Sequence, residues 1–162
     1  MRNLERYPAK DSRNSLLSWK SAKNPLVVLR NIIIAELCRY MPLSAKNILY
    51  KSVGVSLGKN VAISYKVRMD VFFPELLQIG ENSIVGYNTT ILCHEFLINE
   101  LRKGRVKIGK NVMIGANCTI LAGVSIGNDS VVYAMTLVNK NIPPNSFACG
   151  NPMIVRKKRK AR

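Results

Sequence analysis

The chain has 162 residues, 48% of them hydrophobic, and 25 Lys and Arg stand against 9 Asp and Glu, for a formal net charge of +16. This hydrophobic content is enough to build a core, so the composition argues against a globally disordered chain. The four cysteines match no zinc-binding spacing, and we expect them to be reduced thiols in a cytoplasmic protein. They are Cys38, Cys93, Cys118 and Cys149.

The positive charge is concentrated at the two ends of the chain. Residues 1–56 carry 10 basic and 3 acidic side chains (net +7), residues 57–141 carry 9 and 6 (net +3), and residues 142–162 carry 6 and none (net +6). Such basic ends attract partners that bear phosphate. These could be a phosphorylated cofactor, an anionic lipid or a nucleic acid, and charge alone does not choose between them.

Residues 1–50 form a basic N-terminal arm without a clear repeat. Within it, the apolar run 26–41 between Pro25 and Pro42 predicts a helix that is too short and too polar to span a membrane, and no secretory signal is visible. One interpretation is a cap over the open end of a sheet. The other is a peripheral membrane anchor, with Trp19 and basic residues near the headgroups. We favour the cap.

The middle of the chain, residues 51–155, repeats with a period of six. A large aliphatic residue recurs at every sixth position, often followed by Gly, with Asn three positions after it. This period fits neither a helix nor an alternating strand, but it fits a short strand followed by a corner. Three such sides make an 18-residue triangular coil, so the repeats predict about four coils of a solenoid. The repeating positions are Leu57, Ile63, Met69, Ile79, Val85, Ile91, Ile108, Ile114, Ile120, Ile126, Val132 and Val138.

Each column of the repeat has a physical reason. The aliphatic side chains point inward and stack about 4.8 Å from their counterparts in the next coil. Asn tolerates the left-handed backbone conformation that a sharp corner demands. Gly allows neighbouring backbones to approach closely. The sequence therefore predicts an all-β chain, a parallel β-helix with an N-terminal helical segment and a basic C-terminal tail (residues 156–162).

The register of the repeat fails twice, first around residues 74–77 and then between Ile91 and Ile108. We expect residues 97–107 to leave the solenoid as a loop, and loops on a rigid scaffold often carry function. His94, the chain's one histidine, stands at the mouth of this loop in a corner position where other coils carry Asn. Imidazole accepts protons near neutral pH, which makes His94 a candidate general base. The alternative is a histidine that only caps backbone groups.

The runs "IGENSIVGYNTTILCHEF" (79–96) and "IGKNVMIGANCTILAGVSIGNDSVVYAMTLVNKNIPPNSFACGNP" (108–152) resemble the hexapeptide-repeat acyltransferases, in particular the maltose and galactoside O-acetyltransferase type. The resemblance covers about residues 57–155. It implies a left-handed β-helix, a homotrimer with active sites between subunits, and transfer of an acetyl group from acetyl-CoA to an acceptor hydroxyl, with His94 as base. In this family the histidine usually lies slightly further beyond the repeat, in a His–Pro pair, whereas here Glu95 follows it.

Three further residues are candidates for orienting His94 or binding the acceptor: Glu95, Glu100 and Asn88. For Glu95 and Glu100, a solvated carboxylate is an equally good interpretation. A covalent intermediate on Cys93 is disfavoured, because adjacent residues of an extended chain point to opposite sides.

Carried over position by position, the resemblance also implies a set of donor-binding residues. Small side chains at two of these positions would let the cofactor reach the backbone, although ordinary coil packing explains them equally well. Basic residues at the start of the tail suit the phosphates of CoA. The candidates are Met113, Gly115, Ala116, Ala134, Asn139, Lys140, Arg156 and Lys157.

Other functions would place different demands on the sequence. A carbonic anhydrase on the same fold would need several histidines as zinc ligands, so we expect no metal. A nucleic-acid-binding module would need aromatic side chains beside the basic tail, which has none, so we expect no nucleic-acid partner. An inactive scaffold or anion-binding module, a sugar N-acyltransferase and an antibiotic acetyltransferase stay open. The identity of the acceptor does not follow from the sequence.

Overall fold

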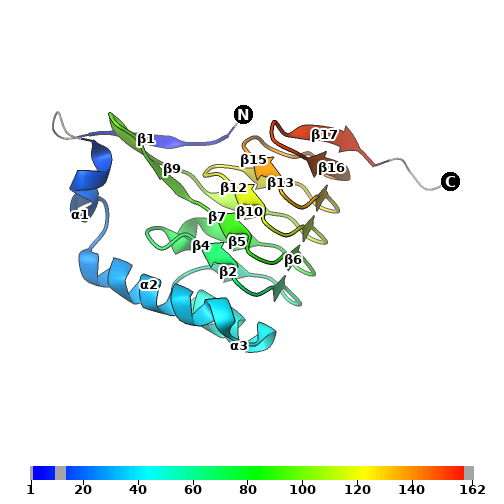
Figure 1. The fold of residues 1–162 in the computed structure, drawn as a ribbon, viewed down its shortest axis with the longest axis horizontal. Coiled ribbons are helices and arrows are strands. Elements are labelled where there is room, and N and C mark those ends of the chain that lie inside the picture. Colours follow the sequence, from blue (N-terminus) through cyan, green and yellow to red (C-terminus); the bar gives the residue numbers. More distant parts are fainter. Residues whose placement is uncertain (1, 10–13, 159–162) are drawn as a thin grey trace.

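The computed structural model describes residues 2–9 and 14–158 (Figure 1). It holds helices at the N-terminal end and short strands through the rest of the chain. The elements are β1 (Glu5–Pro8), η1 (Ser15–Ser18), α1 (Trp19–Ala22), α2 (Pro25–Tyr40), α3 (Leu43–Ser52), β2 (Ser56–Leu57), β3 (Ala62–Ile63), β4 (Arg68–Met69), η2 (Pro74–Leu76), β5 (Leu77–Ile79), β6 (Ile84–Val85), β7 (Thr90–Ile91), β8 (His94–Phe96), β9 (Glu100–Lys103), β10 (Val106–Ile108), β11 (Met113–Ile114), β12 (Thr119–Ile120), β13 (Ser125–Ile126), β14 (Val131–Val132), β15 (Leu137–Val138), β16 (Ser146–Cys149) and β17 (Ile154–Lys157).

The strands of the repeat stack into the three faces of a left-handed parallel β-helix, as the sequence predicted. The first face holds β2, β5, β10 and β13, the second holds β3, β6, β11, β14 and β16, and the third holds β4, β7, β12 and β15. Pairing is parallel and in register, so that Ile114 stands beside Val85 in one neighbouring coil and beside Val132 in the other. A six-residue spacing therefore becomes a column of side chains that runs along the solenoid.

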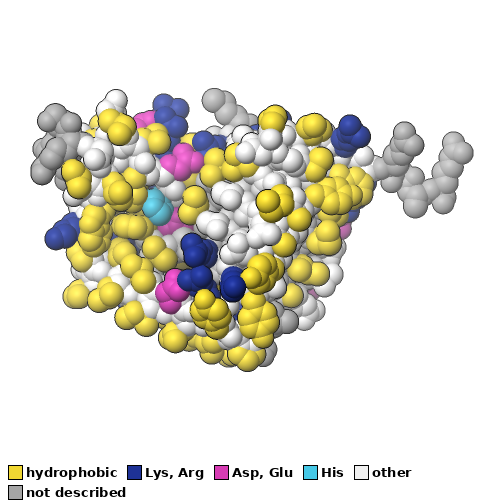
Figure 2. Space-filling view, in the orientation of Figure 1, with side chains coloured by type: hydrophobic (Ala, Val, Ile, Leu, Met, Phe, Trp, Pro, Cys, Tyr) yellow, Lys and Arg dark blue, Asp and Glu magenta, His cyan; other side chains and the backbone are white. Residues whose placement is uncertain are grey.

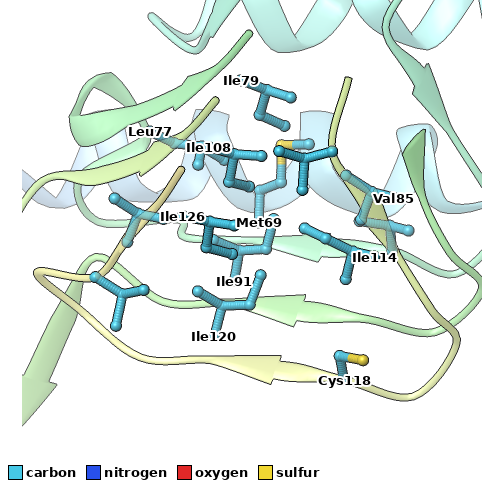
Figure 3. Close-up of a cluster of buried hydrophobic side chains, with 14 of the residues drawn as sticks. Met69, Leu77, Ile79, Val85, Ile91, Ile108, Ile114, Cys118, Ile120 and Ile126 are labelled. Carbon is cyan, nitrogen blue, oxygen red and sulfur yellow. The ribbon is translucent and has the colours of Figure 1, made fainter. Parts of the chain in front are cut away.

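The core of the solenoid consists of these columns. Figure 3 shows Ile79, Ile108, Ile114 and Ile120 pointing into the interior of the prism. The repeating residues from Ile63 to Val138 are almost fully buried. Burying one such side chain contributes about 1.5–3 kcal/mol, and the repetition makes this contribution in every coil.

The corners adopt the backbone conformation that the Asn column predicted. At two of the three corners, the residue three positions after the aliphatic one has φ between 54° and 61°. The side chains there also form a ladder, in which Asn82 Nδ2 donates to Asn111 Oδ1 (2.9 Å) and Asn111 Nδ2 donates to Asp129 Oδ1 (3.0 Å). Lys66 and Met135 occupy the same conformation without the local hydrogen bonding that makes it easier for Asn.

Helices α2 and α3 cover the N-terminal end of the solenoid (Figure 1). Three side chains of α3 donate to carbonyls of the first coil: Lys46 Nζ to Ser64 (3.1 Å), Asn47 Nδ2 to Val61 (2.8 Å) and Tyr50 OH to Val67 (3.3 Å). The exposed edge of the first coil is thus satisfied by side chains rather than by another strand. This arrangement is the cap that the sequence favoured.

The sequence predicted that residues 97–107 leave the solenoid as a loop, whereas the structure shows a β-hairpin with different bounds. The chain leaves the solenoid as an antiparallel hairpin of β8 and β9, and it returns earlier, because Val106–Ile108 already pairs with β5 as strand β10. The arm strand β1 adds to the hairpin, which gives a separate sheet in the order β1–β9–β8. Strand β9 is paired on both sides, with β8 and with β1, which composition alone does not reveal.

No helix within residues 2–9 and 14–158 has the length and hydrophobicity needed to cross a membrane.

Candidate active site

The site is built at the corner that follows the third face of the solenoid. Asp70 comes directly after β4, and His94 begins the hairpin one coil further on, shortly after β7. Because β4 and β7 pair in register, with Met69 beside Ile91, the residues that follow them are brought together although they are 24 positions apart.

Asp70 is buried, with 4% of its surface exposed, and both of its oxygens accept hydrogen bonds. Oδ1 accepts from the backbone amides of Phe72 and Phe73, both at 2.8 Å. Oδ2 accepts from the amide of Cys93 and lies 2.6 Å from His94 Nδ1. Burial by itself would raise the pKa of Asp70, but the hydrogen bonds and charge of His94 and the backbone amides outweigh it and hold the pKa below its ordinary value. Asp70 is therefore a carboxylate.

The Asp70 carboxylate fixes the orientation of the imidazole. A carboxylate can only accept, so His94 Nδ1 must carry the proton that is shared with Asp70. Nε2 then keeps its lone pair and can accept a proton. Figure 2 shows the histidine at the surface of the molecule, where an acceptor could reach it.

Aromatic rings surround the imidazole. The ring centroids of Phe72, Phe96 and Phe73 lie 4.8, 5.0 and 5.8 Å from that of His94. Trp19 of the arm packs edge-on against Phe72 at 5.9 Å. The imidazole therefore lies among aromatic rings and beside a buried carboxylate, where electrostatic interactions are stronger than in water.

The structure corrects two details of the expected site. His94 does not occupy a left-handed corner as the Asn residues do, because its backbone starts strand β8 and pairs with Lys103. The orienting carboxylate is Asp70, which the sequence reasoning missed, and not Glu95 or Glu100. The available signal was the register itself, since Asp70 follows Met69 and Met69 stacks on Ile91.

The other expected partners of His94 are engaged elsewhere. Glu95 forms an ion pair with Arg2 of the arm. Glu100 accepts from Arg102 Nε at 2.6 Å. Asn88 lies at a different corner, between the second and third faces, and its Nδ2 donates to Asn117 Oδ1 at 2.9 Å.

Cys93 is unsuited to act as a nucleophile. Its side chain is fully buried, and burial together with the charge of Asp70 raises the pKa of its thiol. The nucleophilic form of cysteine is the thiolate, which this environment disfavours.

The expected donor-binding residues fall into two groups within one chain. Met113, Gly115, Ala116 and Ala134 lie on the second face and at the corner that follows it, and Gly115 is tightly stacked, since a Cβ there would collide with the backbone of Ala134. Asn139 and Lys140 instead follow β15, at the same corner as His94 and two coils beyond it.

The basic residues of the tail lie with the first of these groups. Strand β17 pairs antiparallel with β16, with Arg156 opposite Phe147. Arg156 lines a cavity of about 320 Å³ together with Tyr133, Phe147, Cys149 and Ile154. Lys157 lies opposite Ser146 and is exposed. Residues 159–162 of the expected tail lie outside the described residues.

In the described part of the chain, no group of three or more His, Cys, Asp or Glu side chains is placed so that it could hold a metal ion.

Comparison with known proteins agrees with this geometry. The family model described as "Hexapeptide repeat of succinyl-transferase" matches residues 105–135. A relative from Bacillus subtilis (strain 168), named "Putative acetyltransferase YvoF", is 46% identical over 155 residues, which is 94% of this chain and 90% of the relative.

Solved structures share the fold. A hexapeptide-repeat acetyltransferase of Vibrio cholerae O1 biovar eltor, crystallised with acetyl-CoA, superimposes with a TM-score of 0.70 at 20% identity, covering 84% of this chain and 88% of that one. A galactoside acetyltransferase in complex with coenzyme A gives a TM-score of 0.61 at 25% identity, covering 83% and 81%.

A triangular β-helix of six-residue repeats, with a histidine and a carboxylate at the base of a hairpin that leaves the coils, defines an acyltransferase of the β-helix class. The chain belongs to the hexapeptide-repeat acetyltransferase family.

Proposed function

We propose that the protein transfers the acetyl group of acetyl-CoA to a hydroxyl of a sugar, glycan or related small molecule, with His94 as general base. The observation that carries this proposal is the 2.6 Å contact between His94 Nδ1 and the buried carboxylate of Asp70. This contact leaves Nε2 as the proton acceptor. A carboxylate that is fully hydrogen-bonded can also stabilise the imidazolium that forms during the reaction.

The proposed reaction is a direct transfer. Nε2 of His94 takes the proton of the acceptor hydroxyl while its oxygen attacks the thioester carbonyl carbon. The tetrahedral intermediate then collapses, the C–S bond breaks, and the imidazolium returns its proton to the departing sulfur. The products are the acetylated acceptor and free CoA.

The donor is proposed to lie along Met113, Gly115, Ala116 and Ala134 of one subunit and to reach the corner of Asn139 and Lys140. Arg156 and Lys157 supply positive charge for its phosphates, and the Arg side chain also supplies a fork of donors. Small side chains at positions 116 and 134 leave the backbone open to hydrogen bonding. The carboxylates of Glu95 and Glu100, and the amide of Asn88, remain proposed acceptor contacts.

We also propose a homotrimer. Within one chain, the first donor group and His94 lie at different corners of the triangle, and packing a second chain alongside would bring one chain's donor corner to another chain's base. Exposed apolar side chains along the second face and its corner support such an interface, because a row of this kind is unusual on a monomer. They are Tyr65, Ile84, Tyr87, Met113, Tyr133 and Met135, which are 43–69% exposed.

The proposed location is the cytoplasm, with a peripheral contact between α2 and a membrane surface. Leu26, Leu29, Ile33 and Leu37 recur at helical spacing on α2 and are 53–75% exposed. Co-sedimentation with vesicles of anionic lipid tests this contact, and a protein that stays in the supernatant at low salt would exclude it.

The experiment that tests the enzyme is thiol release from acetyl-CoA over a panel of sugars, glycans and hydroxylated drugs. Removing a positioned general base typically costs about 10²–10⁴-fold in rate, so His94→Ala should lose at least a hundredfold in kcat with at least one acceptor. The Kd for CoA should not change, which isothermal titration can measure. Leu97→Ala, in the exposed turn of the same hairpin, is the matched control. Turnover that survives His94→Ala would remove His94 as the base.

A further inference from the structure

A second feature beside His94 has no part in the proposed chemistry. A cavity of about 190 Å³ lies between the N-terminal arm, the β8–β9 hairpin and the start of η2. The arm contributes most of its wall. The lining residues are Tyr7, Pro8, Ala9, Ser15, Ser18, Ser21, Ala22, Phe73, Phe96, Leu101 and Lys103.

The cavity adjoins the base. Phe73 and Phe96 line it, and the same two rings contact the imidazole of His94 at 5.8 and 5.0 Å between centroids. The two rings therefore belong both to the wall of the cavity and to the surroundings of His94. Figure 2 shows hydrophobic side chains gathered on this side of the histidine.

The lining offers few polar groups to an occupant. Ser15 Oγ donates to the carbonyl of Leu97 at 2.6 Å, and Ser21 Oγ donates to the carbonyl of Ser18 at 2.8 Å. A fully hydrophilic group would lose its hydration here without equivalent hydrogen bonds in return. An apolar group would gain about 25 cal/mol for each Å² that it removes from water.

Lys103, the cationic residue that lines the cavity, also has partners. The Lys103 ammonium lies 4.5 Å from the centroid of the Tyr7 ring and 5.6 Å from that of Phe73, and it is 3.5 Å from the carboxylate of Glu5. Tyr7 OH donates to the same carboxylate at 2.6 Å. Lys103 thus contacts two of the aromatic walls and already has an acidic partner in Glu5.

The arm is firmly attached where it forms this wall. Strand β1 pairs with β9 over four residues, Ala9 N donates to the Asn99 carbonyl (2.9 Å), and Ser15 N donates to the Leu97 carbonyl (3.2 Å). The cavity is therefore part of the folded chain rather than a gap beside a loose end.

We propose that this cavity binds an apolar part of the acceptor, an aromatic ring or a short alkyl group, while a hydroxyl of the same molecule reaches His94 Nε2. The proposal rests on the proposed function and narrows its substrate class. The acceptor is a hydroxylated small molecule with a hydrophobic substituent, rather than a fully hydrophilic free sugar. The N-terminal arm then selects the acceptor in addition to packing against the hairpin.

Two single substitutions with phenylalanine test the cavity. Ser18→Phe places a ring in it, since Ser18 lines it and is half-buried. Leu17→Phe is the matched control, because Leu17 is the neighbouring residue, is 64% exposed and does not line the cavity. Leu101→Ala, which enlarges the cavity, is a second variant in case Ser18→Phe does not fold.

The kinetic comparison uses phenyl and methyl glycosides of glucose, galactose, mannose and N-acetylglucosamine. In the wild type and Leu17→Phe, kcat/KM for the phenyl glycoside should exceed that for the methyl glycoside by about tenfold or more, from the apolar area that the ring buries. In Ser18→Phe the ratio should fall to about one, with the KM for acetyl-CoA unchanged. Leu101→Ala should shift the preference toward bulkier aryl groups. Equal kcat/KM values in the wild type, or a preference that Ser18→Phe leaves intact, would overturn the proposal.

A binding measurement separates this proposal from the proposed function. Ligand-observed NMR with the phenyl glycosides alone requires no catalysis and should detect binding to the wild type and to Leu17→Phe but not to Ser18→Phe. If CoA does not bind and no thiol is released, the acetyltransfer proposal fails while the NMR experiment still decides the cavity. Absence of phenyl glycoside binding to the wild type would sink the cavity proposal even if acetyl transfer is found.

Discussion

Between Val106 and Val138 the chain places a buried aliphatic side chain in every strand, whereas none of the residues from His94 to Lys103 is fully buried. Every coil packs its aliphatic side chains in the same way, and each coil packs against the next. The hairpin has no core of its own and is stabilised by backbone pairing with β1 and by contacts of individual side chains. The coils therefore bury most of the apolar side chains, and the hairpin holds His94 at its start.

The largest expected effect on stability comes from a cavity in the coils. Ile114→Ala removes a side chain that is 1% exposed and should lower the free energy of unfolding by about 2–5 kcal/mol, because the rigid stack cannot collapse around the gap. Denaturant titration measures this. Leu97→Ala, in the exposed turn of the hairpin, should cost less than about 0.5 kcal/mol, as surface substitutions usually do. A cost at Leu97 as large as that at Ile114 would break the comparison.

The second prediction concerns the surroundings of His94, where the readout is the rate of catalysis rather than stability. Asp70→Asn removes the charge behind His94 and leaves a group that can donate to Nδ1, which favours the wrong tautomer of the imidazole. We expect kcat to fall by up to about 10⁴-fold, the loss found when the carboxylate that orients a catalytic imidazole is replaced by its amide. The KM for acetyl-CoA should change little. A variant with wild-type kcat and an unaltered pH–rate profile would exclude the orienting role.

The same variant has a signature in the dependence of stability on pH. The folded pKa of Asp70 lies below its ordinary value, so its ionised form stabilises the fold above the unfolded pKa, about 3.9, and this stabilisation is lost as the pH falls through the folded pKa. The difference in unfolding free energy between wild type and Asp70→Asn should therefore shrink as the pH falls below the unfolded pKa and through the folded pKa of Asp70. A difference that grows in acid would contradict the assigned pKa direction.

The smallest effect is expected at a corner of the coils. Asn111 has φ of 54° and belongs to the ladder of side-chain amides, so Asn111→Ala should cost about 1–2 kcal/mol, from the left-handed backbone conformation. Lys110→Ala is the control at the adjacent position, which has ordinary backbone and an exposed side chain. Equal thermal unfolding midpoints for the two variants would show that the ladder and the corner conformation contribute nothing.

The regular coils could be predicted from the sequence because the position of a residue within the six-residue repeat determines its burial and backbone conformation. Ile120 is buried because it belongs to the six-residue column, and Asn117 is left-handed because it stands three positions after Ile114. The fold, its core and most of its corners followed from this repetition.

The surroundings of His94 could not be predicted in the same way. Asp70 is 24 positions away, and Trp19 and Tyr7 come from an arm that carries no repeat. The arm runs along the hairpin because β1 pairs with β9. A short polar segment carries no sequence signal for the strand with which it pairs. The sequence pointed to His94 because this residue interrupts the six-residue repeat. Part of its environment comes from a segment that carries no repeat.

The closed ends of the solenoid set a limit on how these molecules can associate. At one end, side chains of α3 already occupy carbonyls of the first coil, and at the other, β17 runs antiparallel on β16 and reverses the direction of the last sheet. On the second face, a further molecule would meet carbonyls already bonded by α3 at one end and an antiparallel strand at the other. The second face is therefore protected against extension by another molecule stacked along the solenoid axis, which disfavours growth into a filament.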